Sequence, residues 1–228
     1  ALSNRINRPD EYMMNPFPEF EDDYFYSEGN PYLIPEIIRN AEFNYQFSKK
    51  GFMFSTNLYY KKIEDKLEQK LFIGEEDKIH TIFHNGSKDR SIGTELMLNV
   101  SPTDWWSINA NANLYHYKVT ADIEGIKTTR ENYSWSTQLV NSLNINKNTS
   151  VQLISYYQNK TVRSQGELSS FFFVDLALKR NFLDGRLSVN VQLKDVFQSL
   201  NYELQTETEN MELLADFNNE SLIFKFNI

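Results

Sequence analysis

The residues best suited to binding chemistry are carboxylates and aromatic rings that follow one another closely in a predicted loop, residues 8–36. The rings could stack on a sugar or another ring-shaped ligand, and the carboxylates could accept hydrogen bonds or hold Ca²⁺. A packed loop with a solvated acidic edge is the alternative. Several prolines favour a stiff, defined loop. We predict ligand contacts at Glu19, Glu21, Asp22, Asp23, Tyr24, Phe25 and Tyr26.

Other patterns that could support chemistry are scarce. His80 and His84 would chelate a metal on a helix, but on a strand they lie about 13 Å apart, too far for one ion. The chain has no cysteine, no GxSxG or HExxH motif and no glycine loop that could cradle a phosphate. We therefore predict no catalytic residue, no metal site and no cofactor, and we do not expect an enzyme.

Composition narrows the class of protein. Hydrophobic residues make up 40% of the 228 residues, yet aromatic residues reach 14%. A polar chain rich in Phe and Tyr must place its apolar groups selectively, as a membrane β-barrel does. No apolar run approaches the roughly 18 residues of a transmembrane helix. The net charge of −8 argues against a nucleic-acid partner.

Alternation of apolar and polar residues predicts strands throughout the chain. Between Trp106 and Leu114, one face carries Trp, Ile, Ala and Leu, and the other carries Ser and Asn. Asn and Gln are depleted in ordinary strands, but they suit a wet or plugged barrel lumen. We predict ten strands at about 1–7, 37–48, 51–65, 78–101, 105–120, 128–146, 150–163, 168–181, 185–198 and 218–228.

The predicted connections alternate in length. Short ones fall at 48–50, 101–104, 146–149 and 182–185, and mostly longer, charged ones at 8–36, 66–77, 121–127 and 199–217. Gln165-Gly166-Glu167 is the exception, being short where a long connection is expected. Outer-membrane barrels pair short periplasmic turns with longer extracellular loops, so the last strand should end in the periplasm.

Two further groups of residues follow from this arrangement. Aromatic residues near strand ends predict contacts with the membrane interfaces. They are Trp105, Trp106, Tyr59, Tyr60, Tyr115, Tyr117, Tyr156 and Tyr157. Alternation places a second group on the lumenal face, where they would contact a plug or solute, or would only be hydrated and paired across strands. They are Glu42, Glu95, Asn109, Asn111, Asn113, Asp175 and Lys179.

A soluble antiparallel β-sandwich is the competing fold, because its strands also alternate. Sandwich strands are usually about 5–6 residues long, and several segments here are two or three times that length.

Ordered motifs add a family resemblance across nearly the whole chain. Asn4-Arg5-Ile6-Asn7-Arg8-Pro9, Asn15-Pro16-Phe17 and Gly29-Asn30-Pro31 through Leu33, Pro35 and Glu36 resemble the "RINRP … NPF … GNPxLxPE" run of outer-membrane β-barrels in TonB-dependent receptors, especially the Bacteroidota type. Further matches in order are Leu58-Tyr59-Tyr60-Lys61, Asn85-Gly86-Ser87, Gly93-Thr94-Glu95-Leu96, Tyr156-Tyr157 with Gln165-Gly166, and Lys194-Asp195-Val196-Phe197.

The resemblance implies a 22-stranded barrel around an N-terminal plug, with a TonB-contacting peptide ahead of it. We expect residues 1–228 to be the C-terminal part of such a barrel, roughly strands 13 to 22, with the plug and N-terminal strands outside this chain. The chain stops at Phe226-Asn227-Ile228, whereas family members usually end on an aromatic residue.

The implied function is import of a scarce solute, such as a siderophore, cobalamin, glycan or peptide, across the bacterial outer membrane. Expected partners are membrane lipid, the plug and N-terminal strands, TonB through the absent N-terminal region, and a surface lipoprotein. Two alternatives stay open: a barrel without a plug that serves as a surface interaction or adhesion module, and a soluble β-sandwich that binds ligands.

Overall fold

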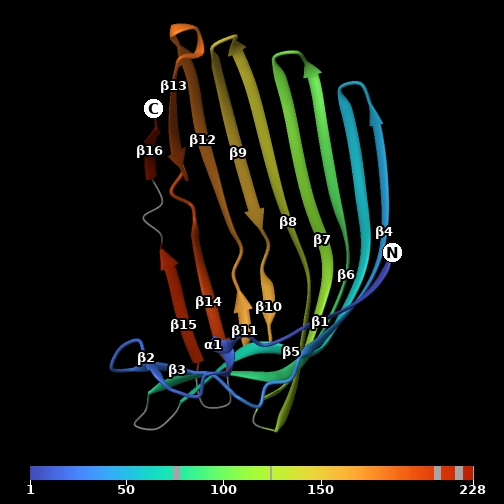
Figure 1. Ribbon diagram of the computed structural model, residues 1–228, viewed down its shortest axis with the longest axis vertical. Helices are drawn as coiled ribbons and strands as arrows, with labels where there is room; N and C mark the ends of the chain where they lie inside the picture. The colour runs from blue at the N-terminus through green and yellow to red at the C-terminus, as the bar shows by residue number, and fades with distance from the viewer. Residues whose placement is uncertain (74–77, 124, 208–211, 219–222, 228) are drawn as a thin grey trace.

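The computed structural model describes residues 1–228 apart from 74–77, 124, 208–211, 219–222 and 228. Its main element is an antiparallel sheet whose strands lie side by side in chain order (Figure 1). The strands on this path are β1 (Leu2–Asn7), β4 (Glu36–Lys49), β5 (Phe52–Ile73), β6 (Ile79–Thr103), β7 (Trp106–Ile123), β8 (Ile126–Asn146), β9 (Thr149–Gln158), β12 (Phe171–Phe182), β13 (Leu187–Lys194) and β16 (Ile223–Asn227). This meander confirms the all-β fold prediction.

Tight turns join neighbouring strands at one end of the sheet, which we call the short-turn end. Between β12 and β13 the turn is a short 3₁₀ segment, η2 (Leu183–Gly185). The opposite, long-loop end carries a second sheet of β10 (Thr161–Arg163), β11 (Gly166–Leu168), β14 (Asn201–Glu207) and β15 (Glu212–Asn218) (Figure 1). It also carries α1 (Glu11–Met14), β2 (Glu19–Phe20) and β3 (Phe25–Glu28), and β3 runs parallel to β6.

The second sheet repeats the strand order of the main sheet. Its strand order is β10-β11-β14-β15, and the corresponding order in the main sheet is β9-β12-β13-β16. Each strand of the second sheet is next in the chain to its counterpart in the main sheet. The main sheet is therefore continued at the long-loop end by the second sheet, which has its own hydrogen bonds. We call the second sheet the extension, and the two sheets together the wall. The anomalous short connection at Gln165-Gly166-Glu167 lies at the tip of the β10–β11 hairpin in this extension.

Strand register divides the main sheet into two faces, because directly opposite residues lie on the same side. Phe43 lies opposite Leu58, which lies opposite Thr94 and then Leu114 and Trp135. One residue along, Asn44 lies opposite Asn57, Glu95, Asn113 and Ser136 in the same way. We call these the apolar face and the polar face.

The apolar face is not covered by any other layer among the described residues. Only four apolar side chains are buried there or elsewhere in that part of the chain: Leu33, Val119, Ala121 and Val174. Large side chains on the apolar face stay exposed: Phe43, Tyr45, Phe47, Leu58, Tyr60, Ile92, Leu114, Tyr133, Trp135, Leu139, Leu153, Phe172, Leu178 and Phe224. A soluble sandwich would bury such a face against a second sheet. A continuous exposed apolar face indicates contact with lipid.

Several predicted boundaries are wrong at the long-loop end. The predicted loop 66–77 belongs to β5 as far as Ile73, and the rest lies outside the described residues. The predicted loops 121–127 and 199–217 are largely strand, in β7 and β8 and in the β14–β15 hairpin. The predicted strands 150–163 and 168–181 are each interrupted between the two sheets, and the predicted strand 185–198 ends at Lys194.

The cause of these errors is a change of environment along each strand. Beyond the apolar layer a strand does not need to alternate, and charged residues such as Lys66, Glu68 and Lys70 can be part of it. The backbone still pairs, because unpaired N–H and C=O groups are costly wherever water is excluded. Alternation therefore identifies the part of each strand that crosses the apolar layer. It does not identify the part of the strand that continues beyond that layer.

Neighbouring residues on β8 allow a test of the two faces. Leu139 lies on the apolar face opposite Ala110, and Gln138 lies on the polar face opposite Asn111. In the full-length protein we expect Leu139→Arg to destabilise the barrel by about 2–4 kcal/mol, because an arginine would face the bilayer interior. Gln138→Arg should cost far less. Urea denaturation in vesicles, followed by heat-modifiable gel mobility, measures both; equal losses would contradict this assignment.

Candidate functional site

The predicted lumenal residues all lie on the polar face. Register links Glu42 through Tyr59 to Gly93 on β6, beside Glu95, and links Asp175 through Ile154 to Val140 on β8. Asn109, Asn111, Asn113 and Lys179 have the same parity on their strands. Their contact with a plug or a solute stays a prediction.

Two neighbouring hollows lie over the polar face. The first, of about 490 Å³, is lined by Glu95, by Tyr156 and by five amide side chains, among other residues: Asn44, Asn57, Asn111, Asn113 and Gln138. The second, of about 380 Å³, is more charged and is lined by Arg5, Glu42, Tyr59 and Lys61 among others. A surface of this kind can accept or donate hydrogen bonds over a wide area.

Hydrogen bonds across strands hold these amides in place. The Asn57 amide donates to Glu95 at 3.1 Å, and the Tyr59 hydroxyl donates to Asn113 Oδ1 at 3.1 Å. The Asn111 amide donates to Asn109 at 2.9 Å along the same strand. The side chains are thus fixed before anything binds, which lowers the entropy lost on binding.

Four of the predicted interface aromatics do not face the apolar layer. Tyr59, Tyr115, Tyr117 and Tyr156 lie on the polar face, as their register partners show. A position near a strand end therefore predicts the face on which an aromatic side chain lies less well than the alternation along the strand does. Tyr60, Tyr157 and Trp106 lie on the apolar face, and the exposed Trp105 lies in the β6–β7 turn; their interfacial role stays a prediction.

The predicted ligand-binding segment lies at the long-loop end, in and between β2 and β3. Asp22 accepts hydrogen bonds from the backbone N–H groups of Tyr24 and Phe25, so it shapes the turn. The Tyr26 ring stacks on His80 at 4.2 Å between centroids. Exposed groups remain at Glu19, Glu21, Asp23 and Tyr24. Part of the segment is therefore structural and part is open to a ligand.

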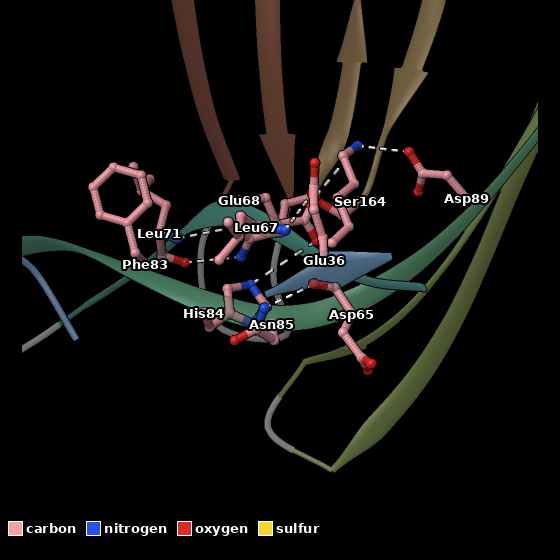
Figure 2. A network of polar contacts seen from close by, with 12 residues as sticks. Glu36, Asp65, Leu67, Glu68, Leu71, Phe83, His84, Asn85, Asp89 and Ser164 are labelled. Atoms are coloured by element: carbon pink, nitrogen blue, oxygen red, sulfur yellow. Dashed lines mark hydrogen bonds and ion pairs between the residues drawn. The ribbon is translucent and has the colours of Figure 1, made fainter. Parts of the chain in front are cut away.

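Asn85 fastens the chain before β4 to the β5–β6 ribbon, and Figure 2 shows it beside Asp65. Its side-chain carbonyl accepts from the Ile34 N–H at 2.9 Å, and its amide donates to the Ile34 and Asp65 carbonyls at 2.9 and 2.7 Å. Asp65 has a φ of 54° where β5 and β6 slip register, so the bulge leaves its carbonyl free of the ladder. Nearby, Asn30 donates to the Phe83 carbonyl.

Glu36 is a second fastening point at the same place (Figure 2). It is buried and accepts from Asn7 at 2.9 Å and from the Leu67 backbone N–H at 3.0 Å. It thereby joins β1, β4 and the outer part of β5. The "RINRP" and "GNPxLxPE" motifs supply Asn7 and Glu36, so these motifs build the scaffold.

A compact charged cluster follows along the ribbon. Lys66 lies 2.7 Å from Asp89 and 3.8 Å from Glu68, and Ser164 donates to Glu68 at 3.0 Å (Figure 2). Burial lowers the pKa of His84, against the opposing effect of Glu68. His84 is therefore favoured in its neutral form, and Lys66 offsets one of the two carboxylate charges.

The tip of the β10–β11 hairpin reaches across to the same ribbon. The Gln165 side chain accepts from the Leu71 N–H and donates to the Leu71 carbonyl, both at 2.9 Å. The next residue, Gly166, has a φ of 122°, and a Cβ there would lie 1.9 Å from the Gln205 carbonyl oxygen. The Gln165-Gly166 motif therefore holds the tip of the β10–β11 hairpin against β5 at the long-loop end.

No metal centre is evident in the described part of the chain. It contains no group of three or more His, Cys, Asp or Glu side chains placed to hold an ion. Nor do the described residues include a helix long and apolar enough to cross a membrane.

Glu36, Asn85, Gln165 and Asp195 were not predicted as site residues. Asp195 is buried; its carboxylate accepts from the N–H groups of Ser199 and Leu200, and its own N–H donates to Asp175. All four lie in motifs that resemble the family pattern, and that position was the only signal in the sequence.

The Asn85 network predicts a specific loss. In the full-length protein, Asn85→Leu should leave the Ile34 and Asp65 backbone groups without this partner, at about 1–3 kcal/mol for each one that water does not reach. We expect faster protease cleavage within residues 8–36 on intact cells, while the heat-modifiable mobility of the barrel is kept. Asn44→Leu, at an exposed position, is the control. Equal cleavage rates in the two variants would contradict this role.

Comparison with known proteins agrees with this geometry. A family model described as "Outer membrane protein beta-barrel family" matches residues 1–228. The structure is similar to the siderophore receptor PirA from Pseudomonas aeruginosa, with a TM-score of 0.63 and 16% sequence identity over 86% of this chain. The match spans 35% of the PirA chain, and at this identity it shows a shared fold alone. No curated protein matches the chain.

Proposed function

This chain belongs to the outer membrane protein β-barrel family, and from that premise we propose that it forms part of the wall of a TonB-dependent receptor that imports a scarce solute. The family places it in the bacterial outer membrane. The solute, a siderophore, cobalamin, glycan or peptide, would pass on the polar face. In this proposal the protein binds and conducts its solute and carries out no covalent chemistry.

The observation that supports the proposal best is the pairing of two opposite faces in one sheet. An exposed apolar face suits lipid, and the amide-rich polar face suits either a wet lumen or a polar domain that fills it. The amides lining the first hollow include Asn57, Asn111 and Asn113, which are held by hydrogen bonds. A polar plug could pair with such a surface and later release it.

The partners follow from this arrangement. The plug and the N-terminal strands would complete the barrel, and TonB would act through an N-terminal region outside this chain. The long-loop end would face the exterior, since barrels of this type place short turns in the periplasm. A surface lipoprotein could dock at this end.

Ligand capture would begin at the segment between β2 and β3. Glu19, Glu21, Asp23 and Tyr24 are exposed there, and the turn that presents them is held by Asp22. The Asp22 carboxylate, Phe25 and Tyr26 would support this surface through the turn and through the stack on His80. Ca²⁺ is not required by this arrangement.

This chain has no cysteine, so a single introduced cysteine is its only thiol, and any cysteine elsewhere in the full-length protein is first replaced by serine. We expect Asn111→Cys in the full-length protein to be protected from a water-soluble maleimide, because the plug covers the polar face. Deleting the plug should expose it and raise labelling severalfold. Leu139→Cys on the apolar face should stay unlabelled in both backgrounds, because it faces lipid.

The outcomes separate the alternatives. Equal labelling of Asn111→Cys with and without the plug segment would mean that nothing packs on this face, and would favour a surface interaction module. Labelling of Leu139→Cys in the intact membrane would mean that the apolar face does not contact lipid. That result would contradict both barrel functions.

A further inference from the structure

Four cations form one row across four neighbouring strands. Arg39 on β4 lies directly opposite Lys62 on β5, which lies opposite Arg90 on β6 and then Lys118 on β7. Directly opposite side chains lie about 4.5–5.5 Å apart at Cβ and on one face of a sheet. These strands stand side by side at one edge of the wall (Figure 1). All four residues have the parity of the apolar face.

The row lies where the apolar layer ends. One step toward the short-turn end, the same strands carry Tyr60, Ile92 and His116, with Tyr133 on β8. Tyr133 is 80% exposed and Ile92 58%. From Val100, near the short turns, to Arg90 is ten residues, or about 26 Å of height at about 3.4 Å per residue and a tilt of about 40°. The apolar band of such barrels is about 25 Å tall.

The row is only partly neutralised by the protein. Glu64 lies 2.8 Å from both Arg39 and Lys62, and Glu131 lies 2.8 Å from Lys118. Arg90, in the middle, is exposed and has no carboxylate partner among the described residues. Lys88 adds a further cation on the same face of β6, one step outward.

The neighbouring cations change the pKa of a carboxylate beside the row. The pKa of Glu64 is lowered, first by its hydrogen bond from Lys62 and then by the charges of Arg39, Lys62 and Lys88. Like charges placed opposite each other destabilise a sheet unless a counter-charge compensates them. In a chain of net charge −8, such a local excess of cations calls for an anionic partner.

We infer that this row binds phosphate-bearing lipid headgroups of the outer leaflet. Position selects lipid, because the row borders the exposed apolar face at the height of the headgroups. Chemistry selects phosphate, because Arg and Lys donate charge-assisted hydrogen bonds to phosphate oxygens, and Arg can do so in bidentate fashion. The inference rests on the proposed orientation, in which the long-loop end faces outward, and it goes beyond the proposed import of a solute.

The test measures lipid retention by the full-length protein. The folded protein, purified in neutral detergent, is offered an equimolar mixture of bis-phosphorylated lipid A and phosphatidylcholine, and bound lipid is counted by native mass spectrometry. We expect lipid A to be retained preferentially. Arg90→Gln should weaken retention about fivefold, as expected for loss of one cation near an anionic surface. Arg90→Lys should keep most of it.

Lys61→Gln provides the matched control, since Lys61 neighbours Lys62 but lies on the polar face. It should leave lipid retention unchanged, and all variants should keep heat-modifiable mobility. Equal retention of the two lipids, or equal losses in Arg90→Gln and Lys61→Gln, would overturn the inference. So would displacement of lipid A by millimolar inorganic phosphate, because that outcome would mark a site for the free anion.

Discussion

The constraint on which this structure depends is that a strand inside a bilayer must satisfy every backbone N–H and C=O group by pairing with another strand. In the described residues the ladder of hydrogen bonds is nearly the whole of the protein's internal structure, since only four apolar side chains are buried. Long, closely registered strands such as β5, β6 and β7 are the consequence. The outer edges of β1 and β16 need strand partners in a bilayer for the same reason.

A ladder with one register also fixes which side chains share a face over many strands. This is why a row of polar residues from Asn57 to Ser136 and a row of cations from Arg39 to Lys118 arise from residues far apart in the chain. A one-residue slip would exchange the two faces. The register is therefore fixed by the difference between the two surroundings. Charged and amide residues are unfavourable against lipid, and apolar residues such as Phe43 and Leu58 are stabilised only there.

The sequence alone predicted the ten strands and the polar face, because alternation is strong wherever one face meets lipid and the other is wet. It failed beyond the apolar layer: Lys66 and Glu68 lie in β5, although their charges suggested a loop. It also failed for Tyr59 and Tyr117, because closeness to a strand end does not specify a face. The roles of Asn85 and Glu36 could not be predicted, since their partners are backbone groups of β5, 20 and 31 residues away, at a register slip.

Those two residues also explain why a family can be recognised while its solute cannot. The motif residues Asn7, Glu36, Asn85 and Gln165 are committed to hydrogen bonds that hold the long-loop end, so their types are set by backbone geometry. Groups free to meet a ligand, such as Glu19, Asp23 and Tyr24, lie outside these motifs on a turn that Asp22 maintains whatever its neighbours are. Because the scaffold does not depend on them, they can change with the solute without loss of the fold, and a shared scaffold carries little information about what is bound.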